Sequence, residues 1–192
     1  MPRLWTETIE GHRRAVHDAA LDATAALVVE RGLASVTMSA IAEQAGIGRA
    51  TLYKYFPDVD AVLTAWHERQ VERHLAHLVD VADRAGSGRR LEAVLLAYAA
   101  LSGQHDGSGP AMQLHRGEHV AHARRRLHAF VRDLLAERAE AGELRGDVPA
   151  DELAGYVLGA LSAAGGMPSE AAVRRLVTVT LAGLRPPGRA RG

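Results

Sequence analysis

A glycine between two short apolar stripes constrains this chain more than any other feature of its sequence. Apolar residues recur at helical spacing before that glycine; they are Ile41, Ala42 and Ala45. Thr37 can cap the start of this first helix, and Gly46 can take the left-handed conformation that ends it. Leu52 and Phe56 are four residues apart, so they share one face of a second helix. We therefore predict a helix-turn-helix over residues 37–56.

The second of these helices is too short to be stable in isolation, so its order must come from packing against other helices. Its other face is then free to enter the major groove of DNA. Arg49 suits a bidentate contact with guanine, Ala50 suits a thymine methyl group, and Gly48 lets the backbone approach. Hydroxyls and Lys54 suit phosphates or base edges. The predicted DNA-contacting residues are Thr37, Ser39, Gly48, Arg49, Ala50, Thr51, Tyr53, Lys54 and Tyr55.

Two of these residues have a plain structural alternative. Arg49 could be an ordinary exposed arginine in the first turn of a helix. Tyr55 could be a half-buried ring that packs beside Phe56.

Residues 21–63 resemble the DNA-binding domain of the tetracycline-repressor (TetR) family of regulators. The matching positions are Leu27, Val28, Gly32, Thr37, Ile41, Ala42, Ala45, Gly46, Ile47, Thr51, Leu52, Tyr53, Tyr55, Phe56 and Pro57. The resemblance implies a DNA-binding transcriptional regulator. Two positions depart from the family pattern. Val59 stands where a phosphate-binding lysine is usual, and Val28, although apolar as the pattern requires, is smaller than the aromatic side chain that is common there.

The rest of the chain also has helical periodicity, interrupted by glycine-rich breaks. We predict helices over residues 11–31, 58–84, 91–101, 150–164 and 169–184, and one short and one long helix within 111–141. The fold class is therefore all-α. With the resemblance, the expected organisation is an N-terminal three-helix helix-turn-helix domain (residues 10–57), joined by a long helix to a C-terminal helical ligand-binding and dimerisation domain (58–185).

The last two predicted helices are the candidate dimer interface. The first has a face of small residues along which another helix can approach, and the second has a broad apolar stripe. In the resembled family these helices form a four-helix interface with a second subunit; the alternative is that they only close the core of one chain. The predicted interface residues are Gly155, Gly159, Ala163, Leu176, Val177, Thr180 and Leu184. Because one recognition helix reads few base pairs, a homodimer on a palindromic operator is expected.

The resemblance also implies an unknown small-molecule effector that releases double-stranded DNA from a repressor. Aromatic rings, a methionine and a few polar groups on inward helix faces would suit its pocket, although plain core packing is the simpler explanation for each. The candidates are Trp66, Leu95, Tyr98, Met112, Gln113, His115 and Phe130.

Histidines suggest a second possibility, a metal-responsive regulator. His115, His119 and His122 fall at positions i, i+4 and i+7, which share one helix face, but Gly117 interrupts that helix. Solvated histidines are the plainer reading, and no metal site is predicted. A third possibility is a dimeric helical adaptor that no longer binds DNA, because Val59 replaces a phosphate contact and the net charge is zero.

Composition excludes several other classes. The absence of cysteine excludes disulfides and thiolate zinc sites. No apolar run approaches the length of a membrane span, and the N-terminus has no apolar stretch of the signal-peptide kind, so a cytoplasmic protein without membrane partners is expected. No phosphate loop, dinucleotide fingerprint or serine-triad context is present, so neither enzymatic activity nor a cofactor is predicted.

Overall fold

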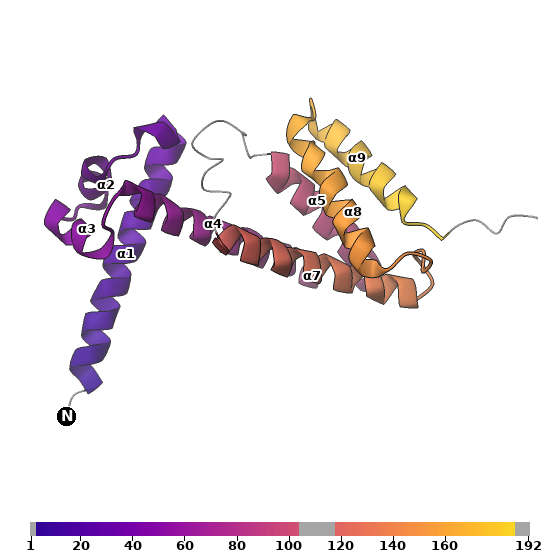
Figure 1. Ribbon diagram of the computed structural model, residues 1–192, viewed down its shortest axis with the longest axis horizontal. Helices are drawn as coiled ribbons and strands as arrows, with labels where there is room; N and C mark the ends of the chain where they lie inside the picture. The colour runs from indigo at the N-terminus through magenta and orange to yellow at the C-terminus, as the bar shows by residue number, and fades with distance from the viewer. Residues whose placement is uncertain (1–2, 104–117, 187–192) are drawn as a thin grey trace, which may run out of the picture. The chain divides into compact units, whose positions relative to one another are not determined.

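The structure is a computed structural model that describes residues 3–103 and 118–186 (Figure 1). Within those ranges every regular element is helical, which confirms the all-α prediction. The elements are α1 (Arg3–Arg31), η1 (Leu33–Ser35), α2 (Met38–Ala45), α3 (Arg49–Tyr55), α4 (Val59–Arg84), η2 (Ser87–Arg89), α5 (Arg90–Gly103), α7 (Glu118–Glu140), α8 (Ala150–Ser162), η3 (Ala163–Gly166) and α9 (Glu170–Gly183). Among these described helices, none is both long and apolar enough to cross a membrane.

Most helix bounds agree with the sequence periodicity, and two differ. The predicted first helix was too short, because α1 begins at Arg3 rather than near residue 11. The apolar stripe from which the predicted bound was drawn begins later, because residues 10–15 are exposed and Val16 is the first buried side chain among the described residues. The helix predicted over 150–164 instead ends at Ser162 and tightens into the 3-10 turn η3.

The described chain forms two compact units that divide within α4, residues 3–70 in the first and residues 71–103 with 118–186 in the second. The first unit encloses its own apolar core between α1, α2, α3 and the start of α4. Its most deeply buried large side chains are Leu21, Leu27, Ile41, Leu52 and Val62. The ring of His17 on α1 also lies 5.1 Å from that of Phe56, centroid to centroid.

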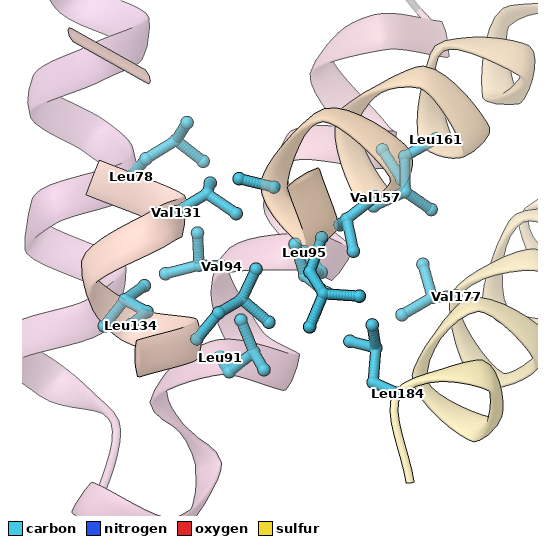
Figure 2. Packing of buried hydrophobic residues seen from close by; sticks show 14 of the residues in the cluster. Leu78, Leu91, Val94, Leu95, Val131, Leu134, Val157, Leu161, Val177 and Leu184 are labelled. Atoms are coloured by element: carbon cyan, nitrogen blue, oxygen red, sulfur yellow. The ribbon is translucent and has the colours of Figure 1, made fainter. Parts of the chain in front are cut away.

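The second unit has a separate core, to which α4, α5, α7, α8 and α9 all contribute (Figure 2). Its labelled side chains are Leu78, Leu91, Val94, Leu95, Val131, Leu134, Val157, Leu161, Val177 and Leu184. Each is nearly or fully buried. At about 1.5–3 kcal/mol for burying such a side chain, this core is the main source of stability of the second unit.

Arg145 fastens the end of α9 to the loop between α7 and α8. Its backbone N–H donates to the carbonyl of Leu184 at 2.8 Å, and its guanidinium donates to the carbonyl of Gly183 at 3.3 Å. The same guanidinium donates to both carboxylate oxygens of Asp147, at 2.9 and 2.7 Å. Asp147 therefore orients the side chain that holds the end of α9.

The hydrogen bonds from Arg145 hold the pKa of the Asp147 carboxyl below its ordinary value of 3.8. A lowered folded-state pKa stabilises the protein at pH values above 3.8, and that contribution is lost as the pH falls through the folded-state value. We expect Asp147→Asn to lower the urea midpoint slightly at pH 7. The difference from the natural protein should disappear in acid, and a difference that is constant with pH would contradict the assignment.

Candidate nucleic-acid interface

Thr37 and Gly46 set the bounds of α2 as predicted. The Thr37 hydroxyl accepts a hydrogen bond from the Ala40 backbone N–H at 3.2 Å, which caps the helix N-terminus. Gly46 has φ 66° and ψ 27°, the left-handed conformation, and Ile47 donates its N–H back to the Ala42 carbonyl at 3.0 Å. The chain then turns directly into α3. The Thr37 hydroxyl proton remains available to a phosphate, because the cap uses only the oxygen.

Helix α3 separates a buried face from an exposed one. Leu52 is fully buried and Phe56, its C-terminal neighbour in the same stripe, is nearly so. The remaining predicted contacts lie on or beside the exposed face. Ser39, Gly48, Arg49, Ala50, Tyr53 and Lys54 are exposed, as is Thr37, whereas Thr51 and Tyr55 are half-buried. Tyr55 packs against the core of the first unit, as expected if its ring is half-buried for structural reasons rather than for contact with DNA.

Arg49 occupies the first position of α3 and reaches back to α2. Its NH1 atom lies 3.5 Å from the Ser39 Oγ and donates a hydrogen bond to it. A bond of this length is weak, so the guanidinium rests beside Ser39 without being committed to it. The predicted base-reading cation and one predicted phosphate or base contact are thereby brought together on the same exposed surface.

The exposed face of α2 and α3 has cations that no carboxylate neutralises. Among the described residues, neither Arg49 nor Lys54 takes part in an ion pair. No acidic residue occurs between Gln44 and Pro57. Although the whole chain has zero net charge, residues 44–57 carry two cations and no acidic side chain, which suits contacts with a phosphate backbone.

The start of α4 holds the position where the resembled family usually has a phosphate-binding lysine. Asp58 caps this helix by accepting a hydrogen bond from the Ala61 backbone N–H at 2.8 Å. Val59, the first residue of the helix, is half-buried against the core of the first unit. A cationic phosphate contact at this position is therefore replaced by an apolar one.

The predicted dimer-interface residues fall into two groups in the second unit. Gly155, Gly159 and Ala163 are exposed at one face of α8 and its end. Leu176 is half-buried, while the remaining three are buried in the core of their own chain; these are Val177, Thr180 and Leu184. Those three side chains already have neighbours and offer little surface to a second subunit.

Two exposed apolar side chains on these helices were missed by the sequence analysis. Tyr156 on α8 is 51% exposed and Val179 on α9 is 66% exposed. Tyr156 lies over α9, because its hydroxyl would be 3.3 Å from a Cβ placed on Gly183. The signal was available, since Tyr156 shares a helix face with Gly159 and Ala163 at helical spacing.

The predicted pocket residues are dispersed. Trp66 packs in the first unit, and its buried indole N–H has no hydrogen-bond partner among the described residues. Leu95 is fully buried in the core of the second unit, and Tyr98 packs beside that core. Phe130 lines an open groove between α4 and α7. The other three candidates, Met112, Gln113 and His115, lie outside the described residues.

The histidine cluster cannot be assembled from the described part of the chain. His122 is exposed on α7, His115 lies outside the described residues, and so does the side chain of His119. Across the described side chains, no group of three histidines and carboxylates is placed to hold a metal ion. The metal-responsive alternative stays a prediction.

Comparison with known proteins gives two family matches that together cover most of the chain. Residues 20–65 match "Bacterial regulatory proteins, tetR family". Residues 89–186, more than half of the 192-residue chain, match "Transcriptional regulator SbtR-like, C-terminal domain". An uncharacterized helix-turn-helix-type transcriptional regulator of Mycobacterium tuberculosis is 39% identical over 74 residues. That match covers 35% of this chain and only 37% of the relative's own length.

Solved structures resemble the fold over most of its length. A TetR/AcrR-family regulator from Thermobifida fusca covers 88% of this chain and 98% of its own, with a TM-score of 0.69 and 21% identity. The fatty acid degradation regulator FadR of Bacillus halodurans covers 90% and 97%, with a TM-score of 0.67 and 18% identity. The ketosteroid regulator KstR2 of M. tuberculosis covers 89% and 95%, with a TM-score of 0.60 and 20% identity. At these identities the likeness concerns the fold.

Proposed function

This chain belongs to the tetR family of bacterial regulatory proteins, and from that premise we propose that it is a ligand-responsive, dimeric DNA-binding transcriptional regulator. Its default state represses transcription from a palindromic operator, and a small molecule releases it. The observation that carries the proposal is the exposed face of α3, where Arg49 stands beside Ser39 with no carboxylate partner among the described residues. Such a face on a well-capped helix-turn-helix suits the major groove. The protein would act in the cytoplasm, where that DNA is.

The proposed contacts divide by chemistry. Arg49 reads guanine, Ala50 meets a thymine methyl group, and Gly48 lets the backbone approach. Phosphates are held by hydroxyl groups and by Lys54, with Ser39 free to contact either a base or a phosphate. The hydroxyl set is Thr37, Thr51, Tyr53 and Tyr55.

A second copy of the chain completes the site. One α3 reads a few base pairs, so a two-fold dimer that presents two such helices is required for a specific operator. We assign the interface to the exposed small-residue face of α8, Gly155, Gly159 and Ala163, extended by Tyr156 and Val179. We propose two domains. Residues 10–57 bind DNA, and residues 58–185 bind the effector and form the dimer.

An electrophoretic mobility-shift experiment with the full chain and the DNA flanking its own gene tests the regulator proposal. We expect a discrete shifted band that survives excess random DNA and fails to form on a scrambled palindrome. Failure to shift any fragment at low salt would overturn the proposal and favour the adaptor alternative.

The half-buried Val59 gives a further prediction. In Val59→Lys, the four-carbon stem can still cover the core while the ammonium reaches the surface. One additional phosphate contact per subunit should tighten binding to operator and random DNA alike, and should steepen the slope of log K against log salt by about 0.9 per contact, or roughly 1.8 for the dimer. Fluorescence anisotropy titrations between low and moderate salt measure this slope. Val59→Met, which adds length without charge, should leave it unchanged.

A further inference from the structure

The open groove between α4 and α7 has the size of a small-molecule site. It has a volume of about 410 Å³, and the described residues that line it all come from these two helices. Pockets for small ligands typically have volumes of about 300–1,000 Å³. The whole groove belongs to the second unit. Its lining consists of Glu72, Leu75, Ala76, Val79, Asp80, Asp83, Arg126 and Phe130.

The middle of the groove is apolar and reachable. Val79 is 45% exposed, an unusual degree for a valine beside a core, and Phe130 of α7 is half-buried at the same groove. Leu75 and Ala76 complete this part of the lining. The groove therefore offers an aliphatic and aromatic surface to the apolar body of a ligand, and burying that body stabilises the complex in proportion to the apolar area removed from water.

The Glu72 end of the groove holds a close pair of opposite charges. Arg126 donates to both carboxylate oxygens of Glu72, at 2.5 and 2.7 Å. Both bonds come from one guanidinium nitrogen, NH1, so each charge has a close partner of opposite sign. The guanidinium of Arg126 is the only cation of the lining, and it is already engaged.

The Asp80 and Asp83 end is different, because its carboxylates are weakly paired. Asp80 contacts Arg84 one turn along α4 at 2.9 Å, and that arginine side chain is 79% exposed. Asp83 is 3.8 Å from Arg90, which it shares with Glu137. Exposed pairs of this kind hold their partners only weakly. Two carboxylates one turn apart thus remain able to attract an incoming cation.

We propose that this groove binds a small organic cation with an apolar body. The cationic head lies between Asp80 and Asp83, and the apolar body lies on Val79 and against the ring of Phe130. Carbon atoms next to the charged nitrogen carry part of its positive charge, so they are also attracted to the face of this ring. An anion is disfavoured, because three carboxylates line the groove against one guanidinium that is already paired. That the bound cation acts as an effector rests on the proposed function. Helix α4 runs without a break from Val59, next to the helix-turn-helix, to the groove.

Isothermal titration calorimetry on the full chain tests the site without DNA. Benzyltriethylammonium is the probe, and 4-phenylbutyrate is the anionic control of similar apolar size. We expect saturable binding of the cation and none of the anion. Absence of heat with the cation at millimolar concentration, or equal binding of the anion, would overturn the proposal.

Substitutions in the groove locate the binding. The double variant Asp80→Asn with Asp83→Asn should weaken cation binding about tenfold, the combined loss of two exposed charge pairs. Val79→Lys places a cation in the groove and should abolish binding; because Val79 is already exposed, the fold should tolerate it. The matched control is Asp133→Asn, an exposed carboxylate of α7 that pairs with Arg132 and lies outside the groove lining. Groove variants with unchanged melting temperature that bind as tightly as the control would place the cation elsewhere and overturn the proposal.

The same preparations separate this inference from the proposed function. DNA binding is measured without the cation, and cation binding without DNA. Cation binding without any DNA binding would sustain the groove and remove the regulator proposal. Operator binding without cation binding would sustain the regulator proposal and remove the cation site. If both hold, benzyltriethylammonium should weaken operator binding by the natural protein at least fivefold more than by the Asp80→Asn, Asp83→Asn variant, and equal weakening would overturn the effector role.

Discussion

Arg49→Ala should abolish selective operator binding while leaving most of the affinity for random DNA. A bidentate arginine–guanine contact discriminates by about 1–3 kcal/mol, and a dimer makes two, so operator affinity should fall by about 30-fold to 10⁴-fold. Random DNA offers Arg49 only phosphates, so the loss there should be small. Anisotropy titrations of operator and random duplexes at one fixed salt concentration measure the ratio.

The geometry of the free protein favours this role for Arg49. Its NH1 atom is 3.5 Å from the Ser39 Oγ, so the guanidinium is held near the exposed surface by a weak bond that a base can replace. A carboxylate in place of the serine would hold the guanidinium by a stronger, charge-assisted bond. Arg49 is therefore held near the exposed surface, and no strong bond has to break before its guanidinium contacts a base.

Two controls decide between base reading and general electrostatics. Arg49→Lys keeps the charge but loses the planar fork, so it should recover random-DNA affinity without recovering selectivity. Arg89→Ala removes an exposed arginine from η2 in the second unit and should change neither quantity. Equal losses on operator and random DNA in Arg49→Ala would show that this residue contacts phosphate only.

The helix-turn-helix was predictable because its signals are local. Thr37 needs only the amide three residues later, and Gly46 needs only its own backbone conformation, so both could be assigned from the chain alone. The buried face of α3 followed equally from the four-residue spacing of Leu52 and Phe56. Local chemistry of this kind does not depend on how distant helices pack.

The distribution of apolar residues in the second unit could not be predicted in the same way. Periodicity marks Val177, Thr180 and Leu184 as one apolar stripe, but it does not say whether the partner of that stripe is the same chain or a second copy. In the structure these residues meet their own core, while Tyr156 and Val179 remain exposed. Trp66 illustrates the same limit, because α4 crosses from one unit to the other and its apolar residues divide between two cores.

Gly159→Glu should convert the dimer to a monomer without destabilising the chain. A Cβ built on Gly159 meets no atom within 4 Å, so one subunit has room for a side chain there. Glutamate is also a better helix former than glycine by roughly 0.5–1 kcal/mol, and α8 itself should gain stability. In a two-fold interface through this face, however, the substitution places two carboxylates near the symmetry axis and fills the close approach that a glycine permits.

Loss of the dimer should have a large effect on operator binding, because the two half-sites would be bound separately. Linking two binding modules raises apparent affinity by about 10²–10⁴, and the variant forfeits that gain. Sedimentation velocity and operator titration of the same sample test both consequences, with Gly159→Ala as the size control and Gly146→Glu, at another glycine with open space around it, as the charge control. A Gly159→Glu protein that still sediments as a dimer and binds operator normally would move the interface away from the exposed face of α8, whereas a monomer with intact melting temperature and operator affinity reduced at least a hundredfold would fix it there.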